Sequence, residues 1–272
     1  MGRPIDAGEA TSWRSYLDSF HHEHPGITES ILERCVDDAG TTPYHWIAAA
    51  IGGSPDRSGS DHQWAGPTVL DLACGSGPMR RLVTGTWVGT DRAPAELGVA
   101  RARGAHPLVL GDAVDLPFAR ASFDVVICSM ALMITQPLDR VLAEITRLLR
   151  PNGRLVALLP ANRPLRSGDL VHVASLLLTL RRTRLAYPND RALTHLPNLL
   201  DPAGLALVDD RRRRFEYSMA TVDAAHDLVR SLYLPGVDPD RIAAADRRSE
   251  RWVGQTFGVP LRRVVAQRVP TL

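Results

Sequence analysis

Three acidic residues and two glycines stand where short apolar runs end, an arrangement that suits a nucleotide-like ligand. The first run ends in Asp71 and passes into a turn that contains Gly75 and Gly77. Asp91 ends the next run, where a carboxylate can accept hydrogen bonds from a ribose diol. Asp112 follows the third run. Glycines in such a turn allow a ligand to approach the backbone closely.

The elements that must position these residues are predicted from residue 68 onward. Short apolar runs alternate there with amphipathic segments, which indicates strands buried on both faces of a parallel sheet and joined by crossover helices. Because ligands bind at the carboxyl ends of such strands, the acids and the glycine turn are expected at one edge. The predicted strands cover 69–73, 87–90, 107–110, 123–128 and 154–159, and the clearest helix covers 137–149.

The rest of the chain is predicted to be largely helical, with a few extended segments. Helices are predicted over 10–20, from a cap at Thr28 or Ser30 to Gly40, over 43–51, 169–182 and 192–200, and after a cap at Thr221. Extended segments are predicted over 205–208, 214–219 and 261–269, and a loop over 52–66. The run Arg211 to Arg214 is predicted to be a solvated face beside an edge strand.

Composition excludes several classes of chemistry. All 32 basic residues are arginine, so a phosphate-binding P-loop and lysine-based chemistry are excluded. The dinucleotide pattern needs a third glycine where this chain has Arg80. The three cysteines, Cys35, Cys74 and Cys128, form no CxxC, so neither a zinc site nor a disulfide framework is indicated.

The segment from Thr68 to Leu159 resembles the class I S-adenosylmethionine-dependent methyltransferases, of the type that acts on small molecules. VLDLACGSGP resembles the family's motif I, D/E-x-G-x-G-x-G, and departs from it at Ala73. VGTD, GDAVDLPF and SFDVVICSM follow in the family's order. The resemblance implies a doubly wound α/β fold with a mostly parallel seven-stranded sheet, the Rossmann-like methyltransferase fold, whose last strand is antiparallel.

The resemblance also implies the cofactor and its binding residues. S-adenosylmethionine would be bound by Asp71, Ala73, Cys74, Gly75, Gly77, Asp91, Arg92, Asp112, Ala113, Ser129 and Met130. The family's reaction is an in-line displacement at a sulfonium methyl, in which the protein mainly positions the nucleophile. The alternative is a Rossmann-like domain that binds a nucleotide and transfers no methyl group.

The acceptor is predicted to be a small, partly apolar metabolite that is methylated on oxygen or nitrogen, in a biosynthetic tailoring step. After the fourth strand the chain has Cys128-Ser129-Met130-Ala131. Enzymes that act on adenine amines or glutamine amides usually carry D/N-P-P-Y there, and metal-dependent catechol methyltransferases carry acids. Two alternatives stay open: the same fold and cofactor used for cyclisation, and an enzyme directed at RNA or protein.

Histidines and aromatic residues outside the motifs are the candidates for catalysis and acceptor binding. His21 and His24 could act as a general base, because the pKa of histidine lies near neutrality; the alternative is an exposed helix end. Tyr16, Tyr44 and His172 could contact the acceptor, with packing in the core as the alternative. No metal site is predicted.

The domain and partner predictions follow from the same patterns. Residues 1–60 are predicted to form a helical lid and 61–272 the methyltransferase domain, with a helical insertion at about 161–200. The net charge of +2 argues against nucleic acid and acidic membranes, and the apolar run 170–180 is too short to span a bilayer. A reduced, cytoplasmic protein is expected, and its oligomeric state is left open between monomer and homodimer.

Overall fold

The computed structural model describes residues 7–52 and 66–270, and within them a seven-stranded sheet confirms the predicted α/β methyltransferase fold. The strands lie in the order β3-β2-β1-β4-β5-β7-β6. They are β1 (Thr68–Leu72), β2 (Thr86–Asp91), β3 (Leu108–Leu110), β4 (Phe123–Ser129), β5 (Leu149–Pro160), β6 (Leu205–Ser218) and β7 (Thr256–Arg268).

The first five strands are parallel, and β7 runs against its neighbours. Val69 pairs with Trp87 of β2 and Val125 of β4, in the same direction. The ends of β6 and β7 pair in reverse, since the Val269 N–H donates to the carbonyl of Gly204 while Met219 and Gln255 are bonded at the other end. β7 also runs against β5, because the Ala161 N–H donates to the carbonyl of Pro260 while the Gln267 side chain, near the other end of β7, donates to the carbonyl of Asn152. The predicted antiparallel last strand is therefore present.

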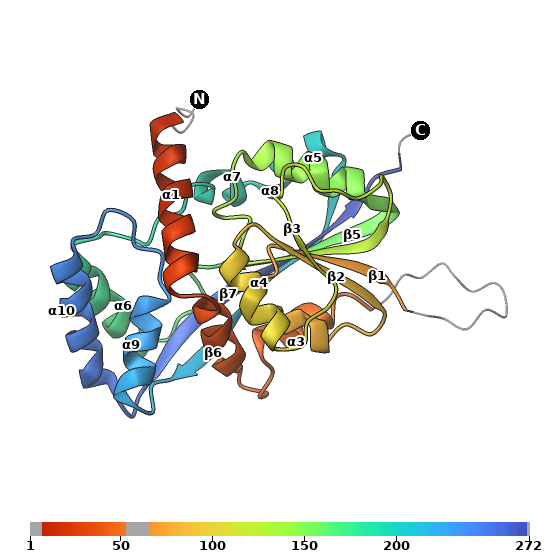
Figure 1. Ribbon diagram of the computed structural model, residues 1–272. Helices are drawn as coiled ribbons and strands as arrows, with labels where there is room; N and C mark the ends of the chain where they lie inside the picture. Colours follow the sequence, from red (N-terminus) through yellow and green to blue (C-terminus); the bar gives the residue numbers. More distant parts are fainter. Residues whose placement is uncertain (1–6, 53–65, 271–272) are drawn as a thin grey trace. The chain divides into compact units, whose positions relative to one another are not determined.

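The centre of the sheet is buried because its strands are apolar on both faces. Val126, Ile127, Val156 and Ala157 on β4 and β5 are all fully buried. The helix α5 (Leu138–Leu148) contributes one apolar face, and α4 (Pro94–Ala102) packs against β2 and β3. Figure 1 shows α5 above the parallel strands and α4 below them, which is the doubly wound arrangement.

The chain divides into two compact units. The first unit holds residues 1–43, 160–188 and 212–261, and the second holds 44–159, 189–211 and 262–272. β6 and β7 run from one unit into the other, and β1 to β4 belong wholly to the second. The predicted lid and insertion residues are therefore shared between the units.

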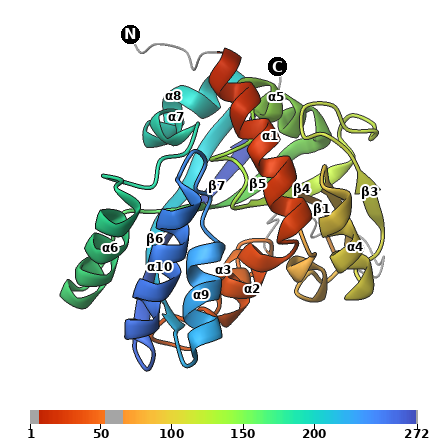
Figure 2. The same cartoon turned by 60° about the vertical axis from the view of Figure 1, so that its left-hand side comes forward.

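The helices of the first unit are α1 (Ala7–Glu23), α2 (Ile27–Arg34), α6 (Ser167–Leu180), α9 (Val222–Arg230) and α10 (Pro239–Ser249). In Figure 2, α9 and α10 lie side by side, and α10 also packs against α6. Thr221 caps α9 as predicted, with its hydroxyl oxygen 3.1 Å from the Ala224 N–H. No helix in the described ranges is long and apolar enough to cross a membrane.

Several predicted elements differ from those observed. The segment after the glycine turn is a single 3-10 turn, Pro78–Arg81, where a full helix was expected. The helix predicted to end at Gly40 ends at Arg34. The helix predicted over 43–51 is the shorter α3 (Pro43–Ala48). The helix predicted over 192–200 is two short helices, α7 (Asp190–Thr194) and α8 (Leu196–Leu200). Pro197 accounts for the break, because a proline inside a helix removes a hydrogen bond and clashes with the carbonyl four residues earlier, whereas it is tolerated in the first turn, where it lies in α8.

The arginine run of β6 and the helix α10 both differ from the predictions. β6 is one continuous strand through Arg211 to Arg214, where a gap was predicted. Arg214 is only 10% exposed and donates to both carboxylate oxygens of Asp169, at 2.6 and 2.7 Å. The run is therefore not wholly a solvated face. α10 was not predicted, because few apolar residues mark its buried side.

Candidate functional site

The strand register places the predicted acids at one edge of the parallel sheet. Leu72 of β1 pairs with Thr90 of β2, so Asp91 stands one residue past that pair. Asp91 itself pairs with Leu110 of β3, which puts Asp112 just beyond the next strand end. All of these residues belong to the second unit. The carboxyl ends of the strands thus carry the acids together, as a ligand site in this fold requires.

Asp91 does more than the sequence indicated, because its carboxylate holds the glycine turn in place. One oxygen accepts a hydrogen bond from the Gly75 N–H and the other from the Ala93 N–H, both at 2.9 Å. The residue is 9% exposed. A carboxylate has about four acceptor positions, and these two bonds engage one position on each oxygen. Asp91 therefore links the turn after β1 to the start of α4.

Asp71 is a buried acid with one carboxylate oxygen, Oδ2, that has no hydrogen-bond partner among the described residues. The residue is 1% exposed, and its Oδ2 accepts no hydrogen bond within the described chain. Burial raises the pKa of Asp71 to about 7, and the nearby Asp91 charge adds to the rise. The Trp87 indole opposes the shift, although its N–H makes no hydrogen bond of normal geometry. A hydrogen-bond donor or a cation placed beside Asp71 would therefore stabilise its ionised form.

The backbone of the turn explains why glycine is present at position 77 and what the alanine at position 73 costs. Gly77 has a φ of +73°, and a Cβ there would lie 2.9 Å from that of Ala105. Gly77 therefore permits close packing against the segment before β3. This packing is a second role for Gly77, beside the close approach of a ligand that the sequence predicts. Ala73 has a φ of +53°, a left-handed conformation that glycine adopts more readily. The alanine is accommodated there at some cost in strain.

The loop that carries Asp112 and Ala113 is held by α5. The Leu116 N–H donates to the Glu144 carboxylate at 2.8 Å, and Arg147 donates to the Leu116 carbonyl at 3.1 Å. Glu144 and Arg147 also pair with each other at 2.6 Å, and hydrogen bonds from Arg147 and Leu116 lower the pKa of Glu144 despite its burial. Sequence reasoning missed this clamp, whose only local signal is an acid and a base three residues apart on a helix.

The end of β4 places Ser129 and Met130 at the same edge of the sheet. The Ser129 hydroxyl is buried and has no hydrogen-bond partner within the described residues. Met130 has a φ of +55°, and its N–H donates to the Leu158 carbonyl at 2.8 Å. Such strained backbone positions often accompany binding sites.

Asn189 fixes the loop that follows β4 and was not singled out in the sequence. Its side-chain amide donates to the carbonyls of Leu132 and Thr135 at 2.7 and 2.6 Å. Its backbone N–H donates to the Met133 carbonyl at 3.1 Å. Asn189 is 6% exposed, and nothing in its neighbourhood in the sequence marks a contact more than 50 residues away.

Tyr16, His21 and His24 lie together in the first unit. The Tyr16 hydroxyl accepts a hydrogen bond from the Leu234 N–H at 2.7 Å, and burial raises the pKa of Tyr16. His21 Nε2 is 3.3 Å from the Tyr233 hydroxyl. His24 packs edge-on against Phe20, as His21 does. The structure therefore brings the two predicted bases into one aromatic cluster, with Tyr233 as a member that the sequence did not reveal.

The other two predicted acceptor contacts lie elsewhere. His172 is 8% exposed, with its Nε2 2.8 Å from the Gln255 side-chain oxygen and its ring beside Trp252 and Phe257. Tyr44 is buried in α3, in the second unit. Among the described residues, no group of three or more histidine, cysteine or acidic side chains is placed to hold a metal ion.

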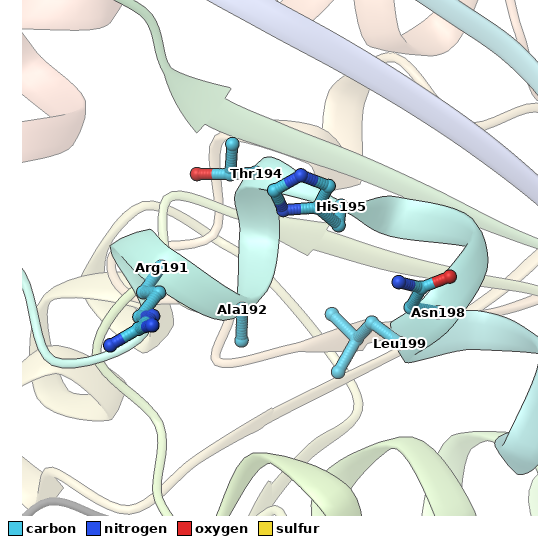
Figure 3. A pocket seen from close by; sticks show the side chains of 6 residues that line it. All are labelled: Arg191, Ala192, Thr194, His195, Asn198 and Leu199. Carbon is cyan, nitrogen blue, oxygen red and sulfur yellow. The ribbon is translucent and has the colours of Figure 1, made fainter. Parts of the chain in front are cut away.

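A surface pocket lies on α7 and α8. None of the residues predicted to bind the cofactor lines it, so it is distinct from the edge that carries the acids. Figure 3 shows its lining, which consists of Arg191, Ala192, Thr194, His195, Asn198 and Leu199.

Comparison with known proteins agrees with this geometry. Residues 70–157 match the family described as a methyltransferase domain. An uncharacterised methyltransferase of Synechocystis is 35% identical over 150 residues, which cover 53% of this chain and 68% of that protein. The chain belongs to the class I S-adenosylmethionine-dependent methyltransferase family. The match within this family includes β1, the glycine turn and β4, the elements that position Asp71 and Ser129.

Other methyltransferases share shorter segments or the fold alone. A demethylmenaquinone methyltransferase of Symbiobacterium thermophilum is 35% identical over 127 residues, which cover 41% of this chain and 51% of that protein. The chain spans about half the length of the first curated relatives that it matches. A Haemonchus contortus phosphoethanolamine N-methyltransferase structure shares the fold, with a TM-score of 0.55, 15% identity, and coverage of 95% of this chain and 60% of that one.

Proposed function

We propose that the chain binds S-adenosylmethionine at the carboxyl ends of β1 to β4 and transfers its methyl group to a small metabolite. The observation that carries the proposal is the pair of acids at this edge. Asp91 holds the glycine turn, while the buried Asp71 has an oxygen without a hydrogen-bond partner. A buried polar atom of this kind calls for a ligand or water, because leaving it unpaired is costly.

The residues present fit this cofactor. A carboxylate such as that of Asp91 can accept hydrogen bonds from a ribose diol, and the loop held by Glu144 carries Asp112 and Ala113, which we assign to the adenine. Asp71 and the Ser129 hydroxyl offer unpaired oxygen atoms at the ends of β1 and β4. A cation beside Asp71 would favour its ionised form. The bound cofactor would supply an electrophilic methyl group on a positively charged sulfur.

The chain's own contribution to catalysis is to position the reactants. In-line displacement requires the nucleophile at roughly 3–3.5 Å from the methyl carbon. Hydrogen bonds hold the glycine turn through Asp91 and the loop after β4 through Asn189, and in this proposal both would position the cofactor. The pair His21 and Tyr233 can accept a proton from an acceptor that arrives protonated, and we propose His21 for this role, with His24 as the second choice.

The acceptor proposed is a small, partly apolar metabolite that is methylated on oxygen or nitrogen in a tailoring step. The names of the relatives support a small, apolar acceptor: demethylmenaquinone methyltransferase, 2-phytyl-1,4-naphthoquinone methyltransferase and nocamycin O-methyltransferase. Among these names, only that of the nocamycin enzyme supports oxygen as the methylated atom. The aromatic cluster around Tyr16 and Phe20 is chemically suited to an aromatic acceptor.

The test is the release of S-adenosylhomocysteine from the full chain. The protein would be incubated with S-adenosylmethionine and a panel of phenols, quinols and amines, with product followed by mass spectrometry. We expect acceptor-dependent S-adenosylhomocysteine from at least one class and its loss in Asp91→Ala. Binding of the cofactor with conversion of an acceptor but without S-adenosylhomocysteine would reject methyl transfer and favour non-methyl chemistry.

A further inference from the structure

The outward face of α6 is apolar from Leu170 to Leu178, although the helix lies at the surface of the first unit (Figure 2). Its buried side is formed by Asp169, His172, Leu176 and Leu180. The opposite side carries Leu170, Val171, Ala174 and Leu178, all exposed. Leu170, Val171 and Leu178 are 55%, 68% and 78% exposed. A surface helix normally presents polar residues outward, so this face is unusual.

Free positive charge stands at both ends of this face. Arg163 precedes α6, and Arg181 and Arg184 follow it; all three are exposed and form no ion pair with any described residue. Asp169 is the sole acid between residues 161 and 189 in the sequence. It is buried and neutralised by Arg214. The face therefore combines exposed apolar side chains with uncompensated arginines.

We propose that the α6 face, defined by Leu170, Val171, Ala174 and Leu178 with Arg163, Arg181 and Arg184 at its ends, docks on an anionic lipid surface. Helices that lie in a membrane interface combine an apolar side with basic residues, and both features add to the strength of binding to anionic lipids. The arginines would meet lipid phosphates while the leucines and valine enter the acyl boundary. This inference goes beyond the proposed function and does not depend on it.

A second copy of the chain is a poorer occupant of the same face. Paired side by side across a two-fold axis, antiparallel α6 helices would bring Arg181 and Arg184 of one copy towards Arg163 of the other. Those like charges repel. The face is also only one 14-residue helix, while a stable interface usually buries about 800 Å² on each partner. The charge pattern suits an anionic surface better.

The proposal revises the expectation that no membrane partner exists. That expectation was drawn from the net charge of +2, which averages over the whole chain. The charges are unevenly distributed, because the segment 161–189 has five arginines and one acid. Local charge, and not the sum, determines attraction to a surface within a Debye length.

The test is co-sedimentation of the full chain with vesicles of phosphatidylcholine alone or mixed equally with phosphatidylglycerol. We expect binding to the mixed vesicles, weaker binding at high salt, and little binding to phosphatidylcholine. Leu178→Gln should weaken partitioning by about tenfold, since a leucine that would be buried in the acyl boundary is lost. Arg181→Gln should weaken it about fivefold. Val222→Gln, an equally conservative change at a 45% exposed valine of α9, should leave it unchanged.

The same variants distinguish the other outcomes. Thermal melting and S-adenosylmethionine affinity would show that each variant is folded, and neither should change. Failure of the wild type to sediment with anionic vesicles would overturn the proposal, as would equal loss in Val222→Gln and Leu178→Gln. A dimer in light scattering that Leu178→Gln dissociates would assign the face to a second copy instead.

Discussion

The buried acid Asp71 gives the sharpest prediction on stability. Its pKa rises from the ordinary 3.8 to about 7 in the folded chain, chiefly by burial. The folded state therefore retains a proton that the unfolded chain has lost at pH 5 or 6. The contribution of Asp71 to stability is favourable below about pH 4 and is lost as the pH rises towards 7. The loss ends near pH 7, where both states are ionised.

The magnitude follows from the two pKa values. A difference of about 3 units, at 1.36 kcal/mol per unit, corresponds to about 4 kcal/mol as an upper limit. Asp71→Asn has almost the same shape and cannot ionise, so it removes this dependence. We expect the free energy of unfolding of Asp71→Asn, relative to wild type, to rise by several kcal/mol between pH 4 and pH 8.

The assay is urea denaturation of both proteins across this pH range, without cofactor. Subtracting one curve from the other cancels the other acids, such as Asp169, whose pKa is lowered and whose stabilisation is lost towards low pH. Asp139→Asn, an exposed change in the first turn of α5, serves as the control and should show no such trend. A difference between wild type and Asp71→Asn that does not vary with pH would refute the reasoning.

The remaining predictions concern the backbone around the site. Ala73→Gly should raise the free energy of unfolding by up to about 1 kcal/mol, because the φ of +53° suits glycine. Ala121→Gly, at a φ of +56° outside the turn, should do the same, but only Ala73→Gly should alter cofactor affinity; destabilisation by Ala73→Gly would contradict the strain argument. Asn189→Ala should cost about 1–3 kcal/mol in urea denaturation and weaken cofactor binding, since two buried hydrogen bonds are lost. Asn198→Ala, exposed on α8, should change neither, and equal effects of the two would remove the role given to Asn189.

Local signals were enough to predict the five parallel strands, β1 to β5, and the position of the acids at their ends. Buried parallel strands are continuously apolar, and the run around Val126 shows this directly in the sequence. The fixed order of Asp71, the glycine turn and Asp91 then places these residues at one edge. Both signals depend only on residues that are close together in the sequence, so the sequence alone was enough to predict these features.

The parts that were missed depend on partners far away in the sequence. The Arg214 side chain is only 10% exposed because Asp169 pairs with it, and Asn189 holds a loop more than 50 residues distant. The continuity of β6 follows from such pairs, which offset the cost of placing arginines in a strand. α10 has no strong apolar stripe, so its helix depends on capping by Asp238 and on packing in the first unit.

The central claim is that the edge formed by Asp71, Gly75 and Asp91 binds S-adenosylmethionine. Isothermal calorimetry with the full chain tests this claim most directly. We predict binding by the wild type, at least tenfold weaker binding by folded Asp91→Ala, since charge-assisted hydrogen bonds are lost, and none by Gly75→Val. Unchanged affinity in a folded Asp91→Ala protein would contradict the account.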